Sequence, residues 1–282
     1  MIAAGKIEEA IAFYGIDGKY RDAVMRCVDA VNASEVFSDA FDRVYRSLYV
    51  DDFSGVGRLY AYKDVDVLFA PGIDPFVTNV MILAGMEIHR TLMAEHELDE
   101  TQTRVHINAI KGSFEGDLKQ GYAATRILMM VWSAHFTRVR IIEVGRLQYE
   151  LKYTEHLKAV MEIHIPGGTP LDPAAVRQSL ADSKEEIRRV FRMEPLTYYC
   201  HSWLLSREIA EMLDEHSNIL LFRKRFEVKD GKDCAGDLLN FLFGMDGCKD
   251  YSLLPETTSL QKKVKAALLE GKVFHLGVGV LK

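Results

Sequence analysis

A pair of glycines precedes the start of an expected helix in the segment HIPGGTPLDP, residues 164–173. Asp172 is a favourable N-cap residue and Pro173 suits the first helical position, so a helix should begin there. The free N–H groups of a helix start attract anions, and Gly167 and Gly168 would let a ligand approach the main chain closely. The pattern predicts a phosphate-binding junction. Paired glycines also occur in ordinary turns, and Asp172 could satisfy the free N–H groups itself, so a plain turn is the alternative.

A carboxylate within an apolar row is the next candidate for chemistry. If the strand through residues 139–151 is unbroken, Glu143 shares its side with Leu147 and Tyr149. Burial would favour the neutral carboxyl group and make the carboxylate a stronger base. A β-bulge at Gly145 would instead move Glu143 to the solvent side of the sheet.

One histidine pair has a spacing that suits a metal ion. His89 and His96 are seven residues apart in the segment 86–98, so they would share one face of a helix. A polar helix face explains the same spacing. The densest basic cluster is residues 223–225, with the sequence Arg-Lys-Arg. An alternating strand would divide these side chains between its two faces, which favours a solvated edge.

The elements that must position these residues change in type along the chain. Apolar residues at three- and four-residue spacing predict helices up to about residue 132, with Ser34 as one N-cap. The expected helical segments are 6–16, 20–31, 34–50, 76–98 and about 117–132.

Alternating segments predominate in the remainder and predict strands. Met161, Ile163 and Ile165 alternate with Glu162 and His164. The expected strands lie in 138–153, 160–166, 196–205, 219–228 and 273–281, with helices at about 173–192, 206–213 and 260–270. We therefore expect an α+β chain, with a helical domain at residues 1–125 and a mixed sheet with flanking helices at 126–282.

Composition excludes several classes of protein. The formal net charge is −6, which disfavours a general binder of nucleic acid or anionic membranes. The four cysteines form no CxxC pair, and no apolar run of about 18 residues or signal-peptide pattern is present, which predicts a reduced, cytoplasmic protein. No GxGxxG follows a strand and no GxxxxGK[S/T] occurs, so the dinucleotide and P-loop motifs lack their residues.

Four segments in a fixed order resemble the C-terminal domain of bacterial GNAT-like acyltransferase proteins. They are HIPGGTPLDP, YYCHSWLL, SNILLFRKRFEV and TSLQKKVKAALLEGKVFHLGVGVL. Such proteins carry a helical N-acyltransferase domain in front, and the resemblance covers essentially the whole chain. It implies a GNAT fold that uses acyl-coenzyme A, such as acetyl-CoA, to acylate an amine.

The resemblance also implies where the donor binds. The pyrophosphate would lie on the loop after a central strand, and the pantetheine arm would enter where that strand and the next one part. On this sequence the cofactor contacts become Ile165, Gly167, Gly168 and Thr169. The loop departs from the Q/R-x-x-G-x-G/A pattern of GNAT enzymes and lacks its basic residue. The basic cluster at 223–225 could instead contact the 3′-phosphate.

Amine acylation needs a general base and a route for a proton to the departing thiolate. The candidate catalytic residues are Glu143, His164, His201 and Tyr199. His164 would lie beside the thioester, with a solvent-facing histidine as the alternative. His201 and Tyr199 would act as base and acid, with aromatic packing of a buried strand as the alternative. Cys200 lacks a readable partner for thiol catalysis.

The sequence thus predicts an acyltransferase that moves an acyl group, most simply acetyl, from acyl-CoA to a small-molecule amine. A ligand-binding or regulatory module without turnover is the first alternative, because the loop is unusual. A metal-dependent hydrolase using His89 and His96 is the second. We expect no nucleic-acid or membrane partner, and the sequence fixes neither the acceptor nor the oligomeric state.

Overall fold

The computed structural model describes residues 1–51, 66–67, 74–153, 159–168, 170–194 and 197–282. Packing divides the chain into two compact units, Met1–Ile142 and Glu143–Lys282. Helix α8 (Ile127–Thr137) follows the boundary expected at residue 125, yet Met130 and Phe136 belong to the core of the first unit. The division therefore comes after this helix, because its apolar side chains pack with the preceding helices.

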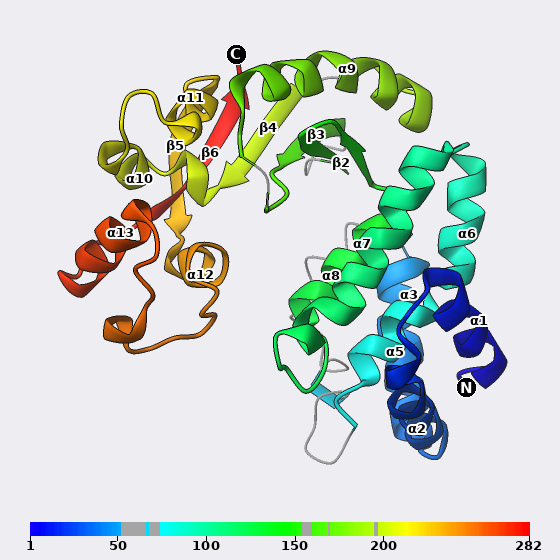
Figure 1. The fold of residues 1–282 in the computed structure, drawn as a ribbon. Helices are drawn as coiled ribbons and strands as arrows, with labels where there is room; N and C mark the ends of the chain where they lie inside the picture. The colour runs from blue at the N-terminus through cyan, green and yellow to red at the C-terminus, as the bar shows by residue number, and fades with distance from the viewer. Residues whose placement is uncertain (52–65, 68–73, 154–158, 169, 195–196) are drawn as a thin grey trace. The chain divides into compact units, whose positions relative to one another are not determined.

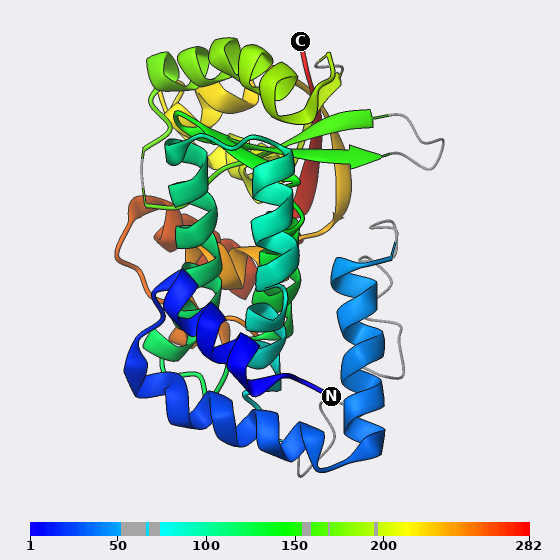
Figure 2. The same ribbon diagram turned by 90° about the vertical axis from the view of Figure 1, so that its right-hand side faces the viewer.

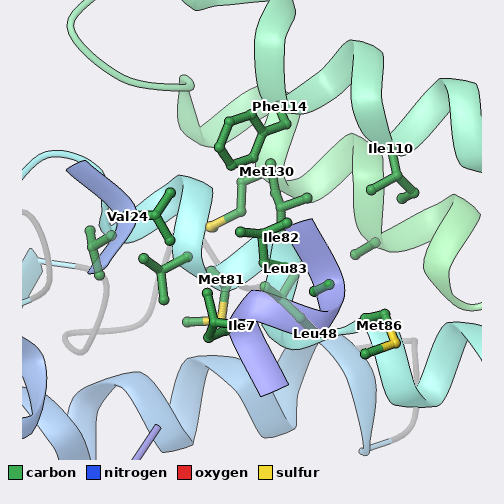
Figure 3. Close-up of a cluster of buried hydrophobic side chains, with 14 of the residues drawn as sticks. Ile7, Val24, Leu48, Met81, Ile82, Leu83, Met86, Ile110, Phe114 and Met130 are labelled. Atoms are coloured by element: carbon green, nitrogen blue, oxygen red, sulfur yellow. The ribbon is translucent and has the colours of Figure 1, made fainter. Parts of the chain in front are cut away.

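The described part of the first unit is almost entirely helical (Figure 1). Its other helices are α1 (Ala4–Tyr14), α2 (Arg21–Asn32), α3 (Glu35–Tyr49), α5 (Val77–Ala84), α6 (Met86–Glu95) and α7 (Glu100–Lys119), with a short 3₁₀ turn at Gly18–Tyr20. Ser34 caps α3 by accepting a hydrogen bond from the Phe37 amide, as predicted. Helix α5 is buried from Val77 to Leu83, and Figure 3 shows Met81, Ile82 and Leu83 within the cluster of apolar side chains.

Two long helices expected in this unit are each interrupted. The segment 76–98 forms α5 and α6, which meet at Gly85. A side chain there would bring a Cβ atom to 3.0 Å from the Tyr49 ring and from Thr137. The helix expected at 117–132 is instead the end of α7 and most of α8, separated at Gly121, whose φ of 91° ends the first helix.

The second unit is built on a six-stranded mixed sheet, which confirms the predicted α+β class. Its strands are β1 (Ile141–Val144), β2 (Leu147–Tyr153), β3 (Ala159–His164), β4 (Thr197–Ser202), β5 (Phe226–Asp233) and β6 (His275–Leu281). Their order across the sheet is β1-β2-β3-β4-β6-β5. Strands β3 and β4 run parallel, whereas β2–β3, β4–β6 and β5–β6 are antiparallel.

Helix α9 (Pro173–Phe191) packs on one face of this sheet (Figures 1 and 2). Its buried serines contact two tyrosines that point from the strands: Ser179 Oγ lies 2.8 Å from Tyr149 Oη, and Ser183 Oγ lies 3.0 Å from Tyr198 Oη. Because α9 carries the chain from the end of β3 to the start of β4, it makes the parallel pairing of these strands possible.

A second, smaller core lies beside the sheet. It is formed by residues from α10 (Arg207–Met212), η4 (Leu238–Leu242), η5 (Tyr251–Leu253), α13 (Ser259–Leu269) and nearby turns. The short helix α12 (Ala235–Asp237) directly precedes η4. The segment 219–228, expected as one strand, contains most of α11 (Asn218–Arg223) and only the start of β5. No helix in the described ranges combines the length and the apolar character needed to cross a membrane.

Candidate active site

Strands β3 and β4 pair only over their first half and then part. Their register runs from Val160 opposite Thr197 to Glu162 opposite Tyr199. Beyond that point β3 remains paired with β2 as far as His164, and β4 remains paired with β6 as far as Ser202. The two strands therefore leave a gap in the ladder, where backbone groups can bind something other than the neighbouring strand.

A cluster of polar side chains borders this gap on the face of the sheet opposite to Tyr149 and Tyr198. Alternation along each strand selects its members, because residues two apart share a face. The cluster consists of Glu150 and Lys152 from β2, Glu162 and His164 from β3, and Tyr199 and His201 from β4. Glu150 and Glu162 lie directly opposite each other in the register, so two buried carboxylates face one another.

Each histidine of this polar cluster is paired with a different carboxylate. His164 Nε2 lies 2.7 Å from Glu150 Oε2, and His201 Nδ1 lies 3.2 Å from Glu162 Oε1. A carboxylate accepts a hydrogen bond, so these ring nitrogens carry the protons. In a neutral imidazole the basic lone pair is then on His164 Nδ1 and on His201 Nε2.

Lys152 contacts the carboxylates of both histidine–carboxylate pairs. Its Nζ lies 3.3 Å from Glu150 Oε2 and forms a closer ion pair with Glu162 Oε2. Burial alone would raise the pKa of Glu162, but the hydrogen bond from His201 and the charge of Lys152 lower it to about 2. Tyr199 donates a 3.2 Å hydrogen bond to Glu162, and burial together with this negative charge holds the pKa of Tyr199 well above its ordinary value.

The lowered pKa of Glu162 predicts an acid-sensitive fold. The carboxylate stabilises the folded chain fully above about pH 4.5, and this contribution is lost as the pH falls toward 2. The contribution of the carboxylate to the free energy of unfolding amounts to about 3 kcal/mol, at about 1.4 kcal/mol per pKa unit. Urea unfolding between pH 6 and pH 3 should therefore show a steeper loss of stability in the native protein than in Glu162→Gln. Equal slopes would contradict the assignment, and Glu227→Gln, at an exposed site on β5, serves as the control.

Glu143 was expected to face the apolar side of the sheet only if the strand through residues 139–151 is unbroken, and this condition is not met. The strand is broken by a turn at Gly145, whose φ is 59°, so β1 and β2 are the two arms of a hairpin. Gln148 donates a 2.7 Å hydrogen bond to Glu143 Oε2 across this hairpin. Glu143 therefore lies beside Gln148 at the polar side and is only partly buried, two strands farther from the gap than His164.

The glycine junction lies at the end of β3, next to the gap. Gly167 and Gly168 are exposed, and an added Cβ at either would meet no atom within 4 Å. Gly168 has a φ of 83°, which only glycine adopts readily. Asp172 caps α9 through the amides of Ala174 and Ala175, at 2.9 and 2.8 Å. Ile165 is partly buried just before the turn.

Basic side chains reach this junction from distant parts of the chain. Arg146, in the β1–β2 turn, donates a 3.0 Å hydrogen bond to the Pro170 carbonyl. Arg225, which precedes β5, donates a 3.1 Å hydrogen bond to the Pro173 carbonyl. Burial and the nearby charge of Arg177 lower the pKa of Arg225. The cationic charge that the loop sequence lacks is thus supplied from outside it. Thr169, also expected as a contact, lies outside the described residues.

The other candidates from the sequence have structural roles. His89 is fully buried among helices, with Nδ1 3.0 Å from Tyr14 Oη and Nε2 3.2 Å from His106 Nδ1, so both ring nitrogens are used. The His89–His96 metal hypothesis therefore loses one ligand. Cys200 is buried on the α9 side of β4, and burial raises the pKa of its thiol well above the ordinary value, so thiol catalysis loses its thiolate. Arg223 donates to the Leu205 carbonyl at 3.0 Å.

Three ligand atoms in the polar cluster also have the spacing of a metal site. One atom each from Glu150, Glu162 and His164 lies within 4.8 Å of the others. The ammonium group of Lys152 already contacts both carboxylates and supplies the positive charge between them. The cluster is therefore better suited to moving protons than to holding a cation.

The sequence proposed the two histidines and Tyr199 as candidates but did not propose the charged groups that they contact. Alternation alone could place Glu162 beside His164, because they are two residues apart in one strand. It could not bring Glu150 opposite Glu162, since that requires the register between β2 and β3. Lys152 carried no signal other than its charge.

Comparison with known proteins agrees with the fold of the second unit. A family model described as the GNAT-like C-terminal domain matches residues 141–281. No curated protein matches the chain. Among solved structures, an acyltransferase in complex with decanoyl-CoA is similar over 97% of this chain and 86% of its own, with a TM-score of 0.70 and 21% identity.

Two further acyltransferase structures cover 98% of this chain and 99% of their own, each with a TM-score of 0.65. One is in complex with decanoyl-CoA and teicoplanin, at 20% identity. The other is in complex with CoA and 10C-teicoplanin, at 19% identity. At this level of identity the similarity establishes a common fold.

Proposed function

The chain belongs to the family with the GNAT-like C-terminal domain, and from this premise we propose that it transfers an acyl group from acyl-CoA to an amine. The observation that carries the proposal is the gap between β3 and β4, bordered on either side by a histidine paired with a carboxylate. Structures of this fold have been determined with acyl-CoA, which supports the same donor here.

The donor fits the gap and the junction beside it. Backbone groups that β3 and β4 do not share beyond Glu162 and Tyr199 can bind the amides of a pantetheine arm. The exposed glycines at 167 and 168 leave room for the diphosphate, and Arg225 with Arg177 supplies positive charge next to it. In this proposal the thioester lies at the level of His164 and His201.

The two histidines divide the proton transfers of the reaction. The amine nitrogen attacks the thioester carbonyl carbon, a C–N bond forms, and the C–S bond breaks. His164 accepts the amine proton at Nδ1, and Glu150 stabilises the imidazolium that results. His201 donates a proton to the departing thiolate. Tyr199 is a weak proton donor because its pKa is raised, so its hydroxyl orients Glu162 instead.

The experiment that tests the proposal is a thermal-shift titration followed by a thiol-release assay. Acetyl-, octanoyl- and decanoyl-CoA are compared as donors, with NAD and ATP as controls, and primary amines are supplied as acceptors. Stabilisation by acyl-CoA follows from ligand linkage, and amine-dependent release of CoA thiol shows transfer. Binding without thiol release would instead favour a ligand-binding module on the same fold, and the absence of both would reject the donor.

Two variants should weaken donor binding without disturbing the fold. Arg225→Ala removes a charged contact to the diphosphate, and Gly167→Val fills space that the ligand needs but that no protein atom occupies. Each should raise the Kd for acyl-CoA about tenfold, which corresponds to about 1.4 kcal/mol in calorimetry. Arg189→Ala, at an exposed ion pair near the far end of α9, and Gly5→Val are the matched controls. An unchanged Kd in both test variants would move the donor away from this junction.

A further inference from the structure

The polar cluster has an unequal number of positive and negative groups. Glu150 and Glu162 contribute two negative charges, and Lys152 contributes one positive charge between them. His164 and His201 are the remaining groups of the cluster that can gain a proton, since Tyr199 stays protonated. With both histidines neutral, the cluster would carry a net charge of −1.

The burial of the two carboxylates makes this imbalance important. The Glu150 side chain is 1% exposed and that of Glu162 is 5% exposed, so water screens their charges poorly. One imidazolium neutralises the cluster, whereas a second would leave an excess of positive charge. The two histidines are therefore coupled through Lys152 and the carboxylates, although His164 and His201 are on different strands.

We propose that Lys152 is a positioning residue that fixes the proton content of this site, so that His164 and His201 together hold one proton at neutral pH. This inference rests on the proposed function for its consequence. One neutral imidazole is available to accept the amine proton, and one imidazolium is available to protonate the thiolate. Turnover then transfers the charge from one histidine to the other without changing the total charge of the cluster.

The charged and titratable groups around Lys152 in the second unit support the proposal of one shared proton. On β2 and β3 they are the two carboxylates and His164, and on β4 they are Tyr199 and His201. Farther along the same face is Glu143, bound by Gln148. On β5 the same face carries Glu227 and Lys229, whose register partners Val280 and Val278 pair with Tyr199 and His201. Lys152 forms ion pairs with both carboxylates of the cluster.

Replacing Lys152 by methionine should raise the number of protons that His164 and His201 together hold at neutral pH from one to two. The two carboxylates would then each hold an imidazolium, and the base for the amine would be lost at neutral pH. The acid limb of the kcat/KM profile should move upward by about one pH unit or more. Lys152→Arg keeps the charge and should retain the native profile.

The direct test counts protons and needs no turnover. ¹⁵N-labelled imidazole signals at pH 7 are assigned with His164→Asn and His201→Asn, and each ring is scored as neutral or cationic. We expect one imidazolium between the two rings in the native protein and in Lys152→Arg, and two in Lys152→Met. The same count in Lys152→Met as in the native protein would overturn the inference, as would two neutral rings in the native protein.

A charge-matched double variant keeps the test decisive if Lys152→Met folds poorly. Lys152→Met with Glu162→Gln again has one more negative than positive charge before the histidines are counted, so it should return to one imidazolium. Two imidazolium rings in this double variant would contradict the role of charge. The number of imidazolium rings is measured without substrates. Failure of the acylation assay can therefore be distinguished from failure of this inference.

Discussion

Replacing His164 by asparagine should lower kcat/KM for acyl transfer by about 100- to 1,000-fold, which is the usual contribution of a general base. Asparagine is too short to reach Glu150, which His164 contacts through Nε2, but the carboxylate keeps Lys152 as a partner. What is lost is the basic nitrogen that accepts the amine proton. The affinity for acyl-CoA should stay within about twofold, because the backbone and the glycine junction provide the donor contacts in this proposal.

His201→Asn should have a smaller effect, about tenfold. A thiol has an ordinary pKa near 8.5, so a thiolate departs readily even without a proton donor. The difference between the two variants therefore assigns their roles. Single-turnover release of CoA thiol measures the chemical step directly, and His216→Asn, at an exposed histidine outside the cluster, is the control. A larger loss in His201→Asn than in His164→Asn would reverse the assignment of base and acid.

Local signals in the sequence were sufficient for elements whose ends are determined by neighbouring residues. Asp172 and Pro173 begin α9 where the capping preferences placed it, and the Thr258–Gln261 capping box begins α13 close to the expected position. The alternation in β3 also put Glu162 and His164 on one face. In each case the decisive contacts join residues within four positions of one another.

The remaining features depend on contacts between distant residues. The partnership of Glu150 with His164 needs the β2–β3 register, and the positive charge at the junction needs Arg225, more than 50 positions from Gly168. The segment 219–228 was expected as a strand because it is apolar and short, which does not separate a buried helix turn from a strand. Tertiary packing determined the outcome there, with Phe222 of α11 buried beside Phe226 of β5.

The largest effect on the fold should come from Gly277→Ala in β6. Gly277 lies opposite Ser202 in the ladder, where β4 ends and η3 (Trp203–Leu205) begins. An added Cβ would lie well inside 3.0 Å of the Leu205 Cβ and carbonyl oxygen, and neither the backbone oxygen nor the Cβ can rotate away. The strand or the turn must therefore shift, which should cost about 3 kcal/mol in the free energy of unfolding.

The same shift reaches the candidate active site, because His201 precedes Ser202 on β4 and the width of the gap depends on where β6 holds that strand. Gly277→Ala should therefore lose acyl-CoA binding as well as stability. Trp203 reports on this turn by fluorescence once Trp132, the other tryptophan of the chain, is replaced by phenylalanine. Gly116→Ala, at an open position in α7, should be neutral or slightly stabilising and serves as the control. A Gly277→Ala protein with native stability and native donor affinity would mean that the contact with Leu205 does not hold β4 in place.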